Sequence, residues 1–184
     1  MRKSFIQKIV IVINGKGGSG KDTVCELLAK HYEVRNISTI TPIKEVAYWG
    51  GWRGGKTDKD RKFLSDLKQL FTEYNDLPNS FAVSEYKKFM ASPVEEVMFV
   101  HIREPENIEK FIHSIDGNCL TLLVRGGKSQ DSYGNASDDG VENYSYDYTY
   151  NNTKPLAEVE KDFLKFFHQI IKDTEKRYLP HECD

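Results

Sequence analysis

The chain has 184 residues, of which 39% are hydrophobic and 29% are charged, and its formal net charge at pH 7 is −2. This length suits one domain with a single core, and the composition is that of an ordinary globular protein. The balanced charge gives no support for a nucleic-acid or membrane partner, and no apolar run is long enough to span a membrane. The three cysteines, Cys25, Cys119 and Cys183, are widely spaced and odd in number, which favours reduced thiols in a cytoplasmic protein.

Strands and helices are predicted to alternate along the chain. Continuous apolar runs typical of strands buried on both faces lie at 8–13, 97–102 and 119–124, and shorter strands are expected at 33–39 and 146–150. Apolar residues at helical spacing predict helices at 22–31, 42–48, 61–77, 81–90, 105–115 and from 155 onward. This alternation indicates an α/β fold with a mainly parallel sheet, in one domain spanning 1–184.

Two segments contain too many glycines and polar residues for regular structure. Residues 49–60 read WGGWRGGKTDKD and are expected to form a mobile loop. Residues 126–143 read GGKSQDSYGNASDDGVEN, and a loop this long inside a compact domain is usually functional or disordered.

Residues 15–23, GKGGSGKDT, join the first predicted strand to the first predicted helix. They match the phosphate-binding loop pattern except at Asp22, where that pattern has serine or threonine. The glycines let backbone N–H groups turn toward phosphate oxygens, the helix N-terminus adds partial positive charge, and Lys21 would reach the terminal phosphates of ATP. The predicted nucleotide-binding residues are Gly15, Lys16, Gly17, Gly18, Ser19, Gly20, Lys21, Asp22 and Thr23.

Asp22 stands where a hydroxyl group usually contacts Mg²⁺. A carboxylate is also an oxygen ligand for a hard cation, so metal binding need not be lost. Its negative charge is tolerable near phosphates only with Mg²⁺ and Lys21 close by, and Thr23 supplies a hydroxyl one residue later. We therefore expect ATP and Mg²⁺ as cofactors, with Asp22 and Thr23 ordering the metal.

GSGKDT after an apolar strand resembles two groups of P-loop kinases, the bacteriophage deoxynucleoside monophosphate kinases and the animal phosphomevalonate kinases. Later segments are similar in the same order: STITPIKEVAYWGG (38–51), FVHIREPENIEKF (99–111), LLVRGGK (122–128) and YGNASDDGVENYSYDYTYNNTKPLAEVEKDF (133–163). The resemblance implies a three-layer P-loop NTPase fold. In it, residues 40–92 would hold the acceptor-binding helices and residues 126–143, with Asp138 and Asp139, would form a lid.

The resemblance also implies transfer of the ATP γ-phosphoryl group to a small phosphorylated acceptor, with a nucleoside or deoxynucleoside monophosphate favoured. Arginines from separate segments neutralise the transferring group in such kinases. The matching catalytic candidates are Lys21, Arg103 and Arg125, and the acceptor-binding candidates are Lys44, Arg61 and Arg103. Asn151 would lie near the ATP base. An ordinary surface charge remains the alternative for Lys44 and each arginine.

This chain departs from the family pattern at one position. His101 stands where the kinases have the aspartate of Asp-x-Arg. Either Glu104 or Asp22 would then take over part of the metal shell, or a neutral histidine would accept a hydrogen bond from a metal-bound water. A catalytically weak ATP-binding protein of the kinase fold therefore stays open as an alternative function.

Other interpretations follow from the same loop and from the tyrosines. KGGSGKDT overlaps the deviant loop of partitioning-type dimeric ATPases, in which Lys16 would be a signature lysine, but the expected aspartate-rich end of the second strand is absent here. The tyrosines Tyr144, Tyr146, Tyr148 and Tyr150 alternate with polar residues, as on one packed strand face. The identity of the acceptor and the oligomeric state stay open, and a phosphomevalonate-like acceptor remains possible.

Overall fold

Five parallel strands form the sheet of this computed structural model, which describes residues 8–126 and 140–178. The strands are β1 (Ile9–Asn14), β2 (Val34–Ser38), β3 (Val97–His101), β4 (Leu120–Gly126) and β5 (Tyr148–Asn152). Their order is β2-β3-β1-β4-β5, and every neighbouring pair is parallel. The predicted α/β fold with a parallel sheet is therefore confirmed.

β1 is the central strand, and all six of its side chains are buried. Ile11 lies opposite Phe99 on β3 and Leu120 on β4 in the sheet register. A strand covered on both faces needs a continuous apolar run, which is what IVIVI supplies. Asn14 ends the run as a buried polar residue at the carboxyl edge of the sheet.

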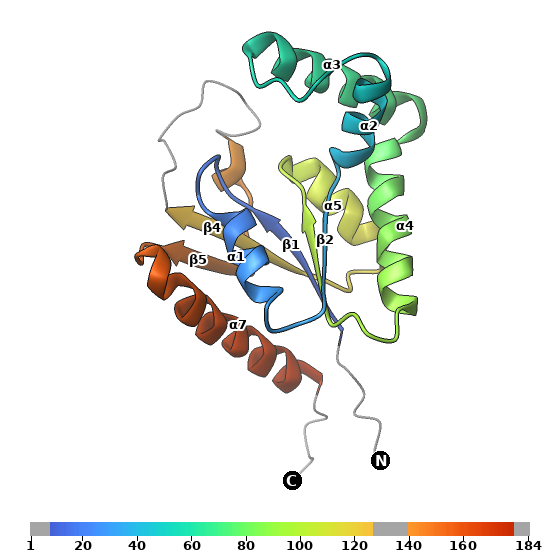
Figure 1. Cartoon of the computed structure of the whole chain (residues 1–184). Coiled ribbons are helices and arrows are strands. Elements are labelled where there is room, and N and C mark those ends of the chain that lie inside the picture. Colours follow the sequence, from blue (N-terminus) through green and yellow to red (C-terminus); the bar gives the residue numbers. More distant parts are fainter. Residues whose placement is uncertain (1–7, 127–139, 179–184) are drawn as a thin grey trace.

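Helices cover both faces of the sheet (Figure 1). Their bounds are α1 (Lys21–Leu28), α2 (Thr41–Trp49), α3 (Asp58–Asn75), α4 (Leu77–Ala91), α5 (Pro105–Ser114) and α7 (Leu156–Tyr178), with a short 3₁₀ helix η1 (Gly140–Asn143). α1 and α7 pack on one face through Leu28 and Phe167, and α4 and α5 pack on the other through Phe89 and Phe111. All six helices predicted from the sequence are present.

α3 begins three residues earlier than the apolar pattern predicts. Thr57 Oγ1 accepts a hydrogen bond from Asp60 N at 3.2 Å, and the Asp60 carboxylate accepts one from Thr57 N at 3.0 Å. These reciprocal bonds form a capping box, which satisfies two backbone donors at the helix start. The cap therefore extends the helix into the segment expected to be a loop.

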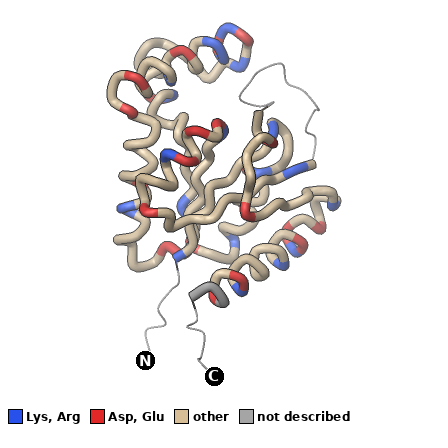
Figure 2. Tube along the Cα trace, turned by 180° about the vertical axis from the view of Figure 1, so that it is seen from behind, with Lys and Arg blue, Asp and Glu red and all other residues tan. Residues whose placement is uncertain are grey.

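α2 and α3 form a cap beyond the carboxyl ends of the strands, at the top of Figure 1. α3 has no buried residue, although its apolar residues recur at helical spacing. Phe63, Leu70 and Tyr74 are 40%, 59% and 81% exposed. Figure 2 shows acidic and basic residues mixed along this helix and along α7. The apolar spacing in this segment thus predicted a helix correctly, but the apolar residues of α3 are not part of the core.

The expectation that four tyrosines share one strand face is wrong. β5 starts at Tyr148, so Tyr144 and Tyr146 precede it. They pack against the β3–α5 side of the core, whereas Tyr148 and Tyr150 pack with α7 on the other side. Asp147 lies between the two pairs of tyrosines and is anchored to β4. Its carboxylate accepts hydrogen bonds from Thr121 N and Oγ1, both at 2.8 Å.

Some features expected from the sequence lie wholly or partly outside the described residues. Only Gly126 and 140–143 of the expected lid are described, so Asp138 and Asp139 are not, and neither is Cys183. Cys25 and Cys119 are free thiols. Within 8–126 and 140–178, none of the helices has both the length and the apolar character needed to cross a membrane.

Phe99 provides a test of the core. It is fully buried on β3, so Phe99→Ala should lower the free energy of unfolding by about 3–5 kcal/mol through lost transfer energy and a cavity. Phe63→Ala, on the exposed face of α3, is the matched control and should change it by no more than about 0.5 kcal/mol. Urea denaturation followed by circular dichroism measures both. Equal losses in the two variants would contradict this packing.

Candidate functional site

β1 and β3 are neighbouring strands, and the segments that follow them at the carboxyl edge go to opposite faces of the sheet. β1 leads into α1, which packs with α7 on one face, and β3 leads into α5, which packs with α4 on the other. In open α/β sheets, ligands bind in the crevice where adjacent strands send their connections to opposite faces. The loop at 15–20 therefore occupies the position where this topology places a ligand.

Asn14 fixes the start of the loop. Its side-chain Nδ2 donates to the Arg103 carbonyl oxygen at 2.9 Å and to Tyr146 Oη at 2.8 Å, and its Oδ1 accepts from Gly15 N at 2.8 Å. Tyr146 Oη in turn donates to the Val141 carbonyl oxygen at 2.8 Å. Burial raises the pKa of Tyr146 to about 12, so the phenol keeps the proton that it donates. The loop is thus held to the end of β3 and to η1.

Two glycines of the loop stand where a side chain has no room. A Cβ on Gly15 would lie 2.5 Å from the Val124 carbonyl oxygen, and one on Gly20 would collide with Asn152 Nδ2. Gly20 also has a φ of 88°, which an L side chain rarely adopts. Ser19 is buried, and its Oγ has no hydrogen-bond partner in the described part of the chain. The loop therefore packs closely against β4 and the end of β5.

α1 begins directly after the loop, and no side chain caps its N-terminus. The first-turn N–H groups and the helix dipole favour an anion at such a terminus. This first turn contains Lys21 and Thr23, both half-buried, and Asp22, whose side chain is 76% exposed. The structure thus places a loop, a helix terminus, an ammonium group, a carboxylate and a hydroxyl group within one short segment.

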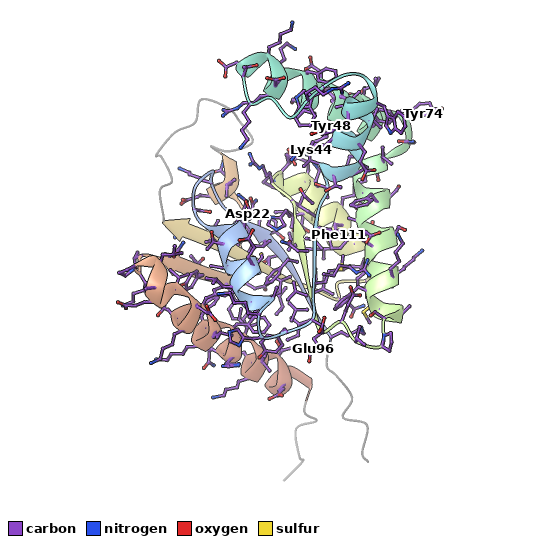
Figure 3. All side chains as sticks on the ribbon, in the orientation of Figure 1. Asp22, Lys44, Tyr48, Tyr74, Glu96 and Phe111 are labelled. Carbon is purple, nitrogen blue, oxygen red and sulfur yellow. The ribbon has the colours of Figure 1, made fainter. Side chains whose placement is uncertain are left out.

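His101 lies at the end of β3 beside this first turn. Its Nδ1 is 3.6 Å from Asp22 Oδ1, and its Nε2 is 2.8 Å from Asn36 Oδ1 on β2. Burial lowers the pKa of His101 to about 4, and the charge of Asp22 opposes that shift only in part. The imidazole is therefore neutral at pH 7. Figure 3 shows Asp22 on α1, on the side of the sheet that faces the viewer.

The sequence suggests that Glu104 replaces an aspartate as a metal ligand, but in the structure its carboxylate is bound to Lys68 and Asn107. Its Oε2 accepts from Lys68 Nζ on α3 at 2.7 Å and from Asn107 Nδ2 at 3.2 Å. Burial alone would raise its pKa, but the Lys68 charge and these hydrogen bonds outweigh burial and lower it. Glu104 thus ties α3 to the start of α5.

Arg125 is the last residue but one of β4, and its guanidinium lies 3.0 Å from the Glu142 carboxylate in a half-exposed pair. Asn151 is its neighbour in the sheet register, is exposed, and lines a shallow hollow of about 1050 Å³ between β5 and α7. The contact with the loop is made instead by Asn152, whose Nδ2 donates to the Ser19 carbonyl oxygen at 3.0 Å.

The acceptor-binding candidates come from three separate elements. Arg103 is exposed just after β3, Lys44 is exposed on α2, and Arg61 is exposed in the first turn of α3. Figure 3 labels Lys44 and Tyr48 on α2, above the strand ends and above Asp22 in that view. Lys44 and Tyr48 are four residues apart and therefore lie on the same face of the helix.

The donor set fits a nucleotide phosphate and a hard cation. The uncapped helix start and the buried Ser19 Oγ suit phosphate, and the Asp22 carboxylate with the Thr23 hydroxyl suits Mg²⁺. Over 8–126 and 140–178, no group of three or more His, Cys, Asp or Glu residues is arranged to hold a metal.

Sequence reasoning missed several residues of this site: Asn14, Asn36, Lys68, Tyr146 and Asn152. A polar residue at the end of an apolar strand was a usable signal for Asn14. The others carry no local signal, because they act on partners far away in sequence, as Asn152 acts on Ser19.

No protein family model and no curated protein sequence matches the chain. Its structure is similar to shikimate kinase from Aquifex aeolicus, with a TM-score of 0.54 and 13% identity over 87% of this chain and 96% of that chain. A gluconokinase from Sinorhizobium meliloti aligns with a TM-score of 0.49 and 16% identity over 96% and 100% of the two chains. At sequence identities this low a structural similarity shows only a shared fold. Of the two, the alignment with the shikimate kinase is the one that supports it. The chain thus shares the α/β fold of this shikimate kinase.

Proposed function

We propose that the chain is an ATP-dependent phosphotransferase that acts on a small phosphorylated acceptor, a nucleoside or deoxynucleoside monophosphate. The observation that carries this proposal is the loop at 15–20. It leads into an uncapped helix start with Lys21 in its first turn, beside the exposed Arg103 after β3. Phosphoryl transfer needs positioning and charge stabilisation more than covalent chemistry, and these groups supply both.

Each group around the loop has a distinct role in this proposal. The backbone of residues 15–20 holds the phosphates, and Lys21 bridges the β- and γ-phosphates. Asp22 and Thr23 hold Mg²⁺, which neutralises part of the phosphate charge when bound. Asn14 keeps the loop in register with the end of β3 through its bond to the Arg103 carbonyl.

Arg103 and Arg125 balance the charge that develops on the transferring group. Arg125 is paired with Glu142, and both side chains are nearly half exposed, so the pair contributes little to stability and exchanges readily for a phosphate oxygen.

Features of α2 support an acceptor that carries a base. Tyr48 is 52% exposed, and its ring meets Trp52 edge-on with centroids 5.4 Å apart. Lys44 lies one turn earlier on the same face. An aromatic face beside an ammonium group suits a nucleobase joined to a phosphate better than an aliphatic phosphate such as phosphomevalonate.

A catalytically weak ATP-binding protein is the second candidate function. The neutral His101 in place of an acidic residue favours it, because one negative charge that would help hold the metal is missing. Acceptor-dependent ADP release separates the two candidates, since a weak binder would release ADP slowly whichever monophosphate is offered.

Lys21→Ala tests the nucleotide site. We expect ADP release from Mg·ATP to depend on one nucleoside or deoxynucleoside monophosphate, and to fall by about 100-fold or more in the variant, since a charge that stabilises the transition state is lost. Lys165→Ala, on the exposed side of α7, is the control and should behave as wild type. Near-normal turnover in Lys21→Ala would refute the assignment.

Asp22→Ala tests the role of the carboxylate in metal binding. The Mg²⁺ concentration needed for half-maximal activity should rise by about tenfold, while metal-free ADP binding should stay equal or improve because a negative charge near phosphate is removed. Calorimetry and Mg²⁺ titrations measure the two effects. Superimposable Mg²⁺ curves for wild type and variant would show that Asp22 has no metal role.

Tyr48→Ala tests the acceptor side. The acceptor KM should rise by about tenfold with the ATP KM unchanged, since one stacking contact is worth about 1–3 kcal/mol. Tyr48→Phe should retain the wild-type KM. Tyr74→Ala, labelled at the far side of the cap in Figure 3 and 81% exposed, is the control and should alter neither constant. An unchanged acceptor KM in Tyr48→Ala would remove the aromatic contact from the site.

A further inference from the structure

His101 at the end of β3 and Asp22 in the first turn of α1 lie next to each other. The distance from His101 Nδ1 to Asp22 Oδ1 is 3.6 Å, and the two side chains are 13% and 76% exposed. The imidazole is therefore held in place by its surroundings, whereas the carboxylate is free to adjust by rotation. Such a pair combines one fixed and one adaptable group.

The hydrogen bond to Asn36 determines which nitrogen of His101 carries the proton. Nε2 lies 2.8 Å from Asn36 Oδ1, an amide oxygen that only accepts, so Nε2 donates. Nδ1 is then the nitrogen left to bind an ion on the Asp22 side of the ring. Metal-ligating histidines show this arrangement, with the remote N–H donated to an oxygen that fixes the tautomer and the ring orientation.

Cys25 does not change this assignment. Its Sγ lies 3.9 Å from His101 Nε2, on the side of the ring away from Asp22's contact at Nδ1. The buried sulfur lies beside Nε2, so it does not share an ion bound at Nδ1. Nδ1 and the Asp22 carboxylate are left as two neighbouring groups that can both bind one ion.

The 3.6 Å between Nδ1 and the carboxylate oxygen is close to the separation of two ligands on one metal ion. Ligand bonds of about 2.0–2.2 Å place two neighbouring ligands of one first-row divalent ion roughly 3–3.5 Å apart. A small rotation of the exposed Asp22 side chain closes the difference from 3.6 Å. Imidazole nitrogen suits transition ions, whereas Mg²⁺ prefers an all-oxygen shell.

We propose that His101 Nδ1 and Asp22 form a two-residue site for a first-row transition ion such as Mn²⁺, completed by nucleotide phosphates. The chain then prefers Mn²⁺ to Mg²⁺ in its nucleotide complex. This metal site depends on one part of the proposed function, the binding of a nucleotide at the loop, and does not depend on phosphoryl transfer. Because no group of three acidic, His or Cys ligands exists within 8–126 and 140–178, tight binding of the ion requires the nucleotide.

Pulsed electron paramagnetic resonance of the Mn²⁺·ADP complex tests the metal–nitrogen bond directly, without an acceptor or turnover. The chain has five histidines, so protein labelled with ¹⁵N only at histidine identifies the residue type. We expect a nitrogen coupling to Mn²⁺ that changes with the label and disappears in His101→Asn. His113→Gln, in the exposed last turn of α5, should keep it. The labelled wild-type protein carries the test even if His101→Asn is unstable.

Competition between Mn²⁺ and Mg²⁺ for the protein·ADP complex gives a second measurement. The Mn²⁺:Mg²⁺ affinity ratio should exceed that of free ADP by about tenfold in wild type, and His101→Asp should remove this excess. Bound Mn²⁺·ADP with no histidine nitrogen coupling, or with one that survives His101→Asn, would overturn the metal site and leave the proposed function standing. If ADP itself does not bind, the proposed function fails, and the metal site fails with it.

Discussion

The buried amide of Asn14 holds together the segments on which the candidate site depends. A polar group at 1% exposure must have its hydrogen bonds satisfied, and those of Asn14 go to the loop, to the end of β3 and to Tyr146. Each partner comes from a different part of the chain. Loss of the amide would therefore leave several buried groups unpaired at once, and the loop would lose its position relative to Arg103.

Two ion pairs near the candidate site, Lys68–Glu104 and Arg125–Glu142, differ in burial. Lys68 and Glu104 link the cap to α5 in a largely buried pair, which is costly to break because either partner alone would be a buried charge. Arg125 and Glu142 form a more exposed pair that is easily exchanged. The buried Lys68–Glu104 pair therefore maintains the structure, whereas the more exposed Arg125–Glu142 pair can open at little cost.

The sequence predicted the sheet and helices well because strands such as β1 show their burial in an unbroken apolar run. It failed at the start of β5, where position depends on a distant partner: β5 begins at Tyr148 because Asp147 is bound to Thr121. The start of α3 was missed for another reason, because its cap, Thr57 with Asp60, is local and interrupts a stretch that looks like a loop. In the site, the loop was visible as a motif, but the Asn36 and Asp22 contacts of His101 were not, since they join three separate elements.

The absence of any buried residue in α3 has a consequence for how this protein can diverge. Substitutions on this helix remove little apolar burial, so most of them leave the free energy of unfolding nearly unchanged. The surface of α3 can then change in sequence while the sheet, with its buried strands, continues to specify the fold. Over time such a protein would accumulate differences mainly on this helix, and the central strands would stay apolar.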